Sequence, residues 1–327
     1  MSELPEHETW KIIDSTKVND FMECPRKYFY KYVVGWKPDT PNNHLHFGVC
    51  WHIAMEHLLL HGYEDQSIID AYEKFLHEYR MEFPPETDEI FYPKTPDNAL
   101  IVLTKYCQEH PDDMKHYRTV DTELAGTITI GEDRFLYFRM DSILERISDE
   151  KIKSREHKTG SGSFLWKEQW HLAFQAGAYN HVLNCLYDPE RVLGVEMNGS
   201  MFRKVKKGWE QMATNQKLTV QPPYEFVRDT IHKNNRQMQS WMDMANAYFA
   251  SIEYEHQLLE KCQEDDDTLE AFPMCPISCV KYNRVCEYHD FCLSWPNPLR
   301  KVHAPEIGFV VDFWNPMEAD AKKVVNV

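Results

Sequence analysis

The stretch that decides the fold is residues 151–160, KIKSREHKTG. Its residues fit a β-strand, in which side chains two positions apart face the same side, so Glu156 and Lys158 project together. A second β-like run, residues 135–144, carries Asp141, and the turn residues 148–150 separate the two runs. If the runs form neighbouring strands, Asp141 joins the other two, and two carboxylates and an ammonium meet on one surface.

Two carboxylates beside a lysine suit a divalent cation with a positioned water. The cation would polarise a phosphate and lower the pKa of the water, while the lysine orients the nucleophile or offsets developing charge. A solvated charged strand face is the simpler alternative, because such triplets are common. Two further signals favour a site: His52 follows Gly48 on a predicted helix, and Gln175 and Tyr179 lie one helical turn apart. Each signal alone would indicate ordinary core packing, but their joint order is far less common.

The elements around this stretch change from helices to strands and back. Helices are predicted over residues 47–60, 65–82, 97–117, 168–186 and 228–262, strands over 127–130, 135–144 and 151–159, and a strand pair over 192–205. This order predicts an α/β core with a helical insertion. We expect a loose leader and a peripheral tail around a single domain, with bounds 1–13 (leader), 14–295 (domain), 47–117 (helical insertion), 118–205 (sheet core), 228–262 (long helix), 275–292 (cysteine segment) and 296–327 (tail).

The composition narrows the class of protein. Hydrophobic residues make up 43% of the 327 residues, which is enough apolar surface for a sizeable core and excludes global disorder. No apolar run is long enough to span a bilayer, and the acidic N-terminus lacks the apolar region of a secretory signal. We therefore expect a soluble, cytoplasmic protein without a membrane partner.

The net charge of −16 argues against indiscriminate adhesion to duplex DNA, because phosphate contacts need local positive potential. A narrow basic channel remains compatible with that charge. Residues 26–32 and 203–209 mix basic and aromatic side chains, a combination that suits stacking on single-stranded bases. A solvated face with core aromatics is the alternative for both segments.

The nine cysteines are odd in number, and four of them crowd into residues 275–292. Without a secretory signal, such a cluster indicates metal–thiolate chemistry rather than disulfides, with buried structural thiols as the alternative. Zinc and iron–sulfur clusters both accept four thiolates. Cys275 and Cys279 could form one zinc knuckle, but the five residues between Cys286 and Cys292 are wide for another. A distant ligand, Cys24, is a further candidate.

These motifs together resemble the PD-(D/E)XK nucleases of RecB and AddB type. The iron–sulfur branch of that family includes the CRISPR-associated spacer-acquisition nuclease and phage relatives. The resemblance runs from about residue 14 to residue 295. It rests on residues 21–28, 48–52, 140–141 and 156–160, on the Gln175-x₃-Tyr179 pair, and on Cys279-x₆-Cys286-x₅-Cys292.

The resemblance implies a restriction-endonuclease-like fold, with a mixed central sheet flanked by helices and a C-terminal iron–sulfur staple. It implies one role for each motif: Mg²⁺ or Mn²⁺ held by His52, Asp141, Glu156 and the carbonyl of His157; an attacking water activated by Lys158; support of the site and the DNA strand by Gln175 and Tyr179; and a [4Fe–4S] cluster on Cys24, Cys279, Cys286 and Cys292.

Two departures from the family pattern concern the cysteines. Many members have two residues where this chain has six between Cys279 and Cys286. Cys275 is an additional thiol, which could replace Cys24 or remain a spectator. We favour the spectator role, because a link from residue 24 to residue 279 closes a loop of 279 − 24 = 255 residues. Cross-linking distant segments restricts the unfolded chain more than a local cluster does.

The function implied by the resemblance is that of a metal-dependent DNA exonuclease. Its expected substrates are single strands or DNA ends, in recombination, repair or phage replication, in a bacterial or phage-infected cell. A helicase or recombination protein is the candidate partner. Two alternatives remain: a non-catalytic DNA-binding or assembly subunit, which the intact histidine, aspartate, glutamate and lysine disfavour, and a zinc–thiolate interaction protein.

Overall fold

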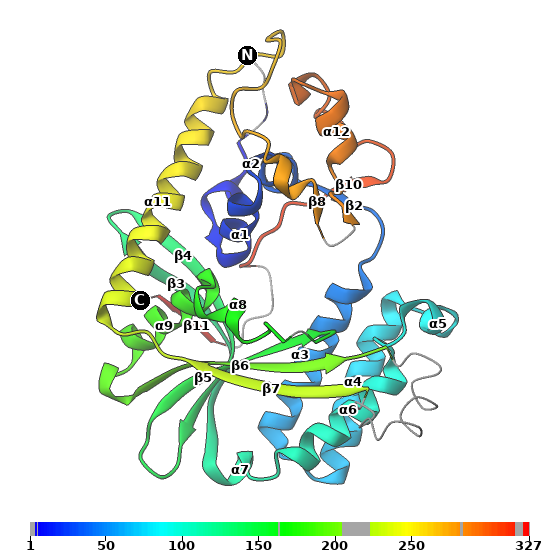
Figure 1. The fold of residues 1–327 in the computed structure, drawn as a ribbon, viewed down its shortest axis with the longest axis vertical. Helices are drawn as coiled ribbons and strands as arrows, with labels where there is room; N and C mark the ends of the chain where they lie inside the picture. Colours follow the sequence, from blue (N-terminus) through cyan, green and yellow to red (C-terminus); the bar gives the residue numbers. More distant parts are fainter. Residues whose placement is uncertain are drawn as a thin grey trace. The chain divides into compact units, whose positions relative to one another are not determined.

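The computed structural model describes residues 4, 6–162, 164–204, 223–281, 284–317 and 323–326 (Figure 1). The chain divides into two compact units. Unit 1 comprises residues 1–40, 125–138 and 234–327, and unit 2 comprises residues 41–124 and 139–233. Two strands pass from one unit into the other: β3 (Tyr117–Gly131) ends in unit 1, and β4 (Arg134–Arg146) begins there.

Strand β5 (Ile152–Gly160) lies within the sheet of unit 2 and carries the stretch that predicted the fold. It pairs antiparallel with β4 and parallel with β6 (Val192–Phe202), which pairs antiparallel with β7 (Tyr224–Ile231). The first six residues of β5 are all buried, as expected for a strand covered on both faces. The mixed sheet and its helices confirm the predicted α/β class.

Helices of unit 2 pack on this sheet and on one another. Helix α9 (Phe174–Leu186) contacts β5 and β6, while α3 (Asn43–His61) contacts β5 and α4 (Asp65–Glu82). Helix α6 (Pro96–Glu109) lies beside α4 (Figure 1). The apolar faces of α3, α4 and α6 share one aromatic-rich core. The shorter elements of the unit are η3 (Pro85–Thr87), α5 (Asp88–Phe91), α7 (Asp113–His116), α8 (Glu168–His171) and η4 (Pro189–Arg191).

Three predicted helix boundaries are wrong. Residues 228–231 belong to β7, and the long helix α11 (Asn235–Leu259) begins only after a capping box formed by Asn234 and Gln237. The helix expected over 97–117 ends at Glu109, just before Pro111, because a residue that precedes proline disfavours the helical conformation. The helix expected over 168–186 is interrupted at residues 172–173, between α8 and α9. The strand pair expected over 192–205 is wrong in its described part, because residues 192–202 form the single strand β6; residue 205 lies outside the described residues.

Unit 1 joins the N-terminal segment to the C-terminal one. Strand β1 (Ile13–Asp14) pairs in parallel with the beginning of β4, and β11 (Lys323–Asn326) is the neighbour of β3. Strand β2 (Trp36–Pro38) pairs with β10 (Phe309–Val311). The remaining elements of the unit are η1 (Glu8–Lys11), α1 (Ser15–Glu23), α2 (Pro25–Tyr28), the π-helical turn η2 (Phe29–Val33), η5 (Pro276–Ser278), β8 (Val280–Lys281), β9 (Arg284–Val285), α12 (His289–Ser294) and η6 (Pro298–Arg300).

Segment 26–32 is part of the core of unit 1, so the prediction that it stacks on DNA bases is wrong. Its three tyrosines are each at most 2% exposed. Lys27 and Lys31 form ion pairs with Asp20, at 3.0 and 2.7 Å. Arg26 donates to backbone carbonyls of the segment before the cysteines. The basic side chains of this segment therefore bind a carboxylate and backbone carbonyls of the protein itself.

A network of charged side chains is buried in unit 2. Lys153 and Arg155, on β5, each donate to Glu196 on β6 at 2.5 Å. Arg155 also donates to Asp113 at 2.7 Å, and Arg228, on β7, donates to both oxygens of Asp113. The two arginines hold the pKa of Asp113 well below its usual range, although burial acts in the opposite direction. The network thereby ties three strands to the short helix α7.

We expect Asp113→Ala to lower the free energy of unfolding by about 3–5 kcal/mol, because it leaves buried arginines without a counter-charge. Urea denaturation of both proteins measures the difference. Asp112→Ala is the matched control, since the neighbouring Asp112 side chain is 61% exposed and pairs only with a surface lysine among the described residues. Equal losses in both variants would contradict the prediction.

The same network predicts a pH dependence of stability. Because the folded-state pKa of Asp113 is below its unfolded value of about 4, its contribution is fully present above that pH. We expect the contribution to decline as the pH falls further, when the unfolded carboxylate takes up protons before the folded one does. The stability difference between wild type and Asp113→Ala should therefore shrink between about pH 5 and pH 3 in urea titrations.

Among the described helices, none combines the length and apolar character that a bilayer span requires.

Candidate active site

Adjacent strands bring Asp141 and Glu156 together. The antiparallel register of β4 and β5 pairs Ser142 with Arg155, so the next position along pairs Asp141 with Glu156. The backbone N–H of His157 donates to Oδ2 of Asp141 at 2.7 Å. The expectation that the two β runs are neighbouring strands is therefore confirmed, and Asp141 is held against the backbone of β5.

His52 reaches the same aspartate from α3. Its Nδ1 lies 3.1 Å from Oδ1 of Asp141. Burial would lower the pKa of His52, but the adjacent carboxylate of Asp141 outweighs it and raises the pKa above its ordinary value. Burial likewise opposes ionisation of Asp141, yet the His52 ring and the Lys158 ammonium hold its pKa well below the usual range. Asp141 is thus an ionised carboxylate whose two oxygens face different neighbours.

Glu156 is fully buried, and neither of its carboxylate oxygens has a hydrogen-bond partner among the described residues. Burial and the like charge of Asp141 raise its pKa well above the ordinary value, although the Lys158 ammonium acts against the shift. A buried carboxylate without a partner is costly unless it takes up a proton or coordinates a cation. The surroundings of Glu156 therefore fit a bound divalent cation.

Lys158 is half-buried near the end of β5, with its ammonium 5.8 Å from the centre of the Trp170 ring on α8. This cation–π contact holds the ammonium near the segment that follows β5 without neutralising it. The lysine remains available to an anionic group.

Gln175 and Tyr179 lie one turn apart on α9, as predicted. The amide of Gln175 donates to the hydroxyl of Tyr179 at 2.9 Å, and that hydroxyl donates to the backbone carbonyl of Arg139. Tyr179 is buried. The pair therefore braces β4 two residues before Asp141.

The imidazole of His157 belongs to the buried network. Its Nδ1 accepts from the side-chain amide of Asn198 at 2.9 Å, so the ring proton is assigned to Nε2. Burial lowers the pKa of His157 to about 3, and the ring is neutral. Asn198 also contacts Arg228 and Tyr106, which links β5 to the network of Asp113.

Glu123, on β3, is a site residue that the sequence motifs did not identify. Ligand atoms of His52, Glu123 and Asp141 all lie within 4.8 Å of one another, and Glu156 does not join this group among the described residues. Arg139 donates to Glu123 at 2.6 Å. The available signal in the sequence was the place of Glu123 on the strand before the one that carries Asp141.

Four cysteines gather in unit 1. Burial raises the pKa of the Cys292 thiol to about 11, and Cys24, Cys286 and Cys279 add to the shift, so these three thiols are within electrostatic range of Cys292. The six residues between Cys279 and Cys286 include the paired strands β8 and β9, and the N–H of Cys286 donates to the carbonyl of Cys279 at 2.9 Å. The N–H of Cys275 donates to Sγ of Cys24 at 3.3 Å.

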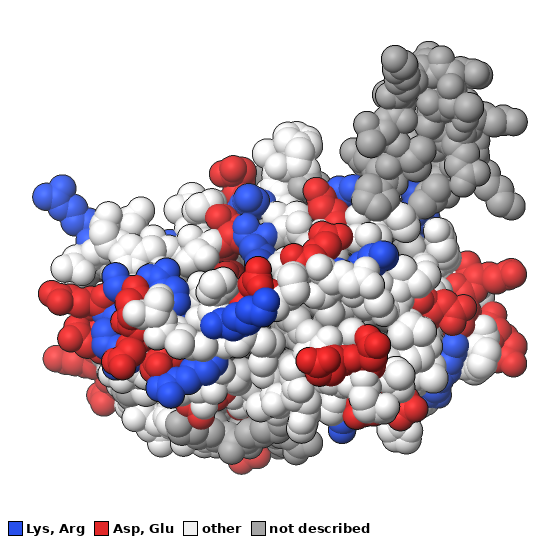
Figure 2. All heavy atoms as spheres, turned by 90° about the horizontal axis from the view of Figure 1, so that it is seen from below, with Lys and Arg blue, Asp and Glu red and all other residues white. Residues whose placement is uncertain are grey.

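The charged surface is mixed. Figure 2 shows acidic and basic side chains interspersed over the described residues of the face that it presents. In the second candidate segment for DNA contact, Arg203 forms an ion pair with Glu225, and residues 205–209 lie outside the described residues.

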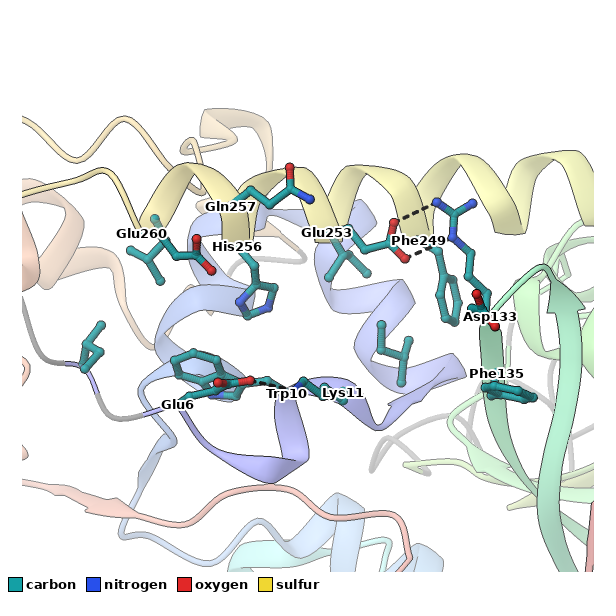
Figure 3. Close-up of a pocket in the computed structure, with 15 residues that line it drawn as sticks. Glu6, Trp10, Lys11, Asp133, Phe135, Phe249, Glu253, His256, Gln257 and Glu260 are labelled. Atoms are coloured by element: carbon teal, nitrogen blue, oxygen red, sulfur yellow. Dashed lines mark hydrogen bonds and ion pairs between the residues drawn. The ribbon is translucent and has the colours of Figure 1, made fainter.

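A cavity of about 660 Å³ lies in unit 1, away from all these residues. Its walls come from η1, from the turn between β3 and β4, and from α11 (Figure 3). Arg134 and Glu253 form an ion pair at its rim, at 2.7 Å. None of the candidate catalytic or cysteine residues lines this cavity.

A model of the PD-(D/E)XK nuclease superfamily matches residues 15–293. The match includes His52, Asp141, Glu156 and Lys158, and it spans most of the 327 residues. No curated protein matches the sequence.

Proposed function

The chain belongs to the PD-(D/E)XK nuclease superfamily, and from this premise we propose that it is a metal-dependent exodeoxyribonuclease. The observation that carries the proposal is the state of Glu156. Its carboxylate is fully buried without a partner and lies on the strand that also carries Lys158, next to Asp141. Structural stability alone does not favour such an arrangement, whereas a bound cation would offset its cost.

The residues proposed to hold Mg²⁺ or Mn²⁺ are His52, Asp141, Glu156 and the carbonyl of His157. Two carboxylates and an imidazole are suitable ligands for Mn²⁺, and carboxylates suit Mg²⁺. When bound, the cation withdraws charge from a phosphoryl oxygen and makes a nearby water more acidic. Nδ1 of His52 lies 3.1 Å from Oδ1 of Asp141. The backbone N–H of His157 donates to Oδ2 of the same aspartate.

Lys158 is proposed to orient the attacking water or to offset the charge that develops on the phosphate. The Lys158 side chain is half-buried with its ammonium positioned by Trp170, and partial burial strengthens the attraction between an ammonium and an anion. Gln175 and Tyr179 are proposed to act by positioning, because their hydrogen bonds end on the backbone of β4. Any contact of this pair with the DNA strand is part of the proposal.

We further propose a [4Fe–4S] cluster on Cys24, Cys279, Cys286 and Cys292, with Cys275 as a spectator. The electrostatic influence of Cys24, Cys279 and Cys286 on Cys292 supports this set. The N–H of Cys275 that points to Sγ of Cys24 is the kind of donor that stabilises cluster thiolates.

The proposed substrates are single-stranded DNA and DNA ends, in recombination, repair or phage replication. The support is electrostatic: the net charge is −16, and several basic side chains are engaged in ion pairs within the protein. Phosphate contacts along a duplex need a continuous positive surface, whereas a strand end needs contacts only near the site. A helicase or recombination protein would supply such ends.

The decisive experiment measures Mn²⁺-dependent degradation of internally labelled DNA by anaerobically purified protein. The substrates are linear single strands, linear duplex and circular single strands. We expect linear single strands to be degraded, circular strands to remain intact, and EDTA to abolish activity. Cleavage of the circles would overturn the exonuclease assignment, and folded protein that degrades none of the substrates would overturn the nuclease assignment.

A further inference from the structure

We propose that Glu123 is a metal ligand, and that with His52 and Asp141 it forms a cation position from which Glu156 is absent. This inference rests on the proposed nuclease function. It extends that function by adding Glu123 as a ligand and by separating the cation held with His52 from Glu156. The three residues offer one imidazole nitrogen and two carboxylate oxygens within 4.8 Å of one another. That donor set and spacing suit one divalent cation.

The backbone of β3 orients Glu123 in an unusual way. Its φ of +49° lies in the left-handed region, which a glutamate on a strand rarely adopts. Such a conformation costs of the order of 1–3 kcal/mol and persists where surrounding contacts enforce it. Arg139, on the neighbouring β4, holds the Oε2 atom of Glu123 at 2.6 Å. The Glu123 side chain is 13% exposed, so it is a held carboxylate rather than a mobile surface group.

The charge balance around Asp141 favours an additional cation. Three carboxylates, those of Glu123, Asp141 and Glu156, influence one another electrostatically. Arg139 pairs with Glu123, and Lys158 acts on Asp141 and Glu156. Carboxylates gathered away from water are costly unless protons or a cation offset them, and a divalent cation suits the ligand atoms of His52, Glu123 and Asp141.

Glu156 supplies an independent observation that points to a ligand. It is fully buried with no hydrogen-bond partner among the described residues. Asp141 presents Oδ1 to His52 and Oδ2 to the N–H of His157 on β5. The aspartate thus lies between the group of His52 and Glu123 and the strand that carries Glu156.

The test measures Mn²⁺ binding by isothermal titration and by pulsed electron paramagnetic resonance, which detects an imidazole nitrogen bound to the ion. We expect Glu123→Gln to weaken binding of the nitrogen-coordinated Mn²⁺ by at least about tenfold, since even second-sphere changes cost that much. Glu156→Gln should keep the nitrogen-coordinated ion. Glu56→Gln is the matched control, because Glu56 lies one turn from His52 on α3 and is outside the ligand group.

A second variant separates ligand loss from misfolding. Glu123→Asp keeps the charge but withdraws the carboxylate, so it should weaken Mn²⁺ binding less than Glu123→Gln while the thermal midpoint stays near that of wild type. Wild-type Mn²⁺ binding by Glu123→Gln, or loss of the nitrogen signal in Glu156→Gln, overturns the inference. If wild type and variants bind Mn²⁺ as expected but wild type degrades no DNA, the proposed nuclease function fails while the ligand assignment stands.

Discussion

Lys158→Ala protein should fold as wild type does and lose at least about 10²-fold in the rate of DNA degradation, the range that a positioned proton-transfer or electrostatic group contributes. The side chain is half-buried and contacts the ring of Trp170, with no ion pair in the described part of the chain. Removal should therefore cost little stability. The loss should appear in kcat more than in KM, because the lysine acts most strongly on charge that develops in the transition state.

The control for this prediction is Lys167→Ala, which removes an exposed lysine nine positions along the chain. It lowers the net positive charge near the site by the same amount without touching the proposed site residues. Lys158→Arg should recover little activity, since the planar guanidinium directs its hydrogen bonds differently from an ammonium. Unaltered kcat in Lys158→Ala, or an equal loss in Lys167→Ala, would remove Lys158 from the catalytic assignment.

Cys292→Ser, and equally Cys24→Ser, should abolish the brown colour of the purified protein and strongly reduce its thermal stability. Joining residue 24 to residue 279 closes a loop of 279 − 24 = 255 residues. By chain-entropy reasoning, loss of a cross-link over such a loop costs about 5 kcal/mol. Visible absorbance and iron content measure the cluster, and thermal denaturation under anaerobic conditions measures the stability.

Two further cysteines provide the comparison. Cys275→Ser should keep iron and colour if Cys275 is a spectator, and Cys185→Ser, at an exposed position on α9, should leave both unchanged. Loss of iron in Cys275→Ser with retention in Cys24→Ser would exchange the roles of these two residues. A colourless wild type that contains one equivalent of zinc would replace the iron–sulfur proposal with a zinc site.

Local spacing in the sequence was sufficient to predict how the central part of the candidate site is arranged. The alternation of Glu156 and Lys158, the turn at 148–150 and the run that carries Asp141 predicted two neighbouring strands, and the register of β4 and β5 agrees. The one-turn spacing of Gln175 and Tyr179 predicted a helical pair that is joined by a hydrogen bond. These features can be predicted from the sequence because the side-chain periods of strands and helices relate residues only a few positions apart.

Contacts between distant segments were decided by the tertiary structure. Glu123 enters the site through an unusual backbone angle and a bond to Arg139, neither of which has a sequence signature. The tyrosines of segment 26–32 are buried, although beside lysines they are equally typical of a nucleic-acid surface. Composition reports what a side chain is able to bind, whereas packing determines which partner it meets.

The sequence by itself determined the α/β class, the strands of the nuclease motif and the residue types that suit a divalent cation. Only the tertiary structure decided that Glu156 is buried without a partner and that Asp113 joins two arginines from different strands. The physical reason is one of range. Backbone periodicity depends on neighbours along the chain, while burial, charge balance and metal-ligand distances depend on which strands and helices pack together.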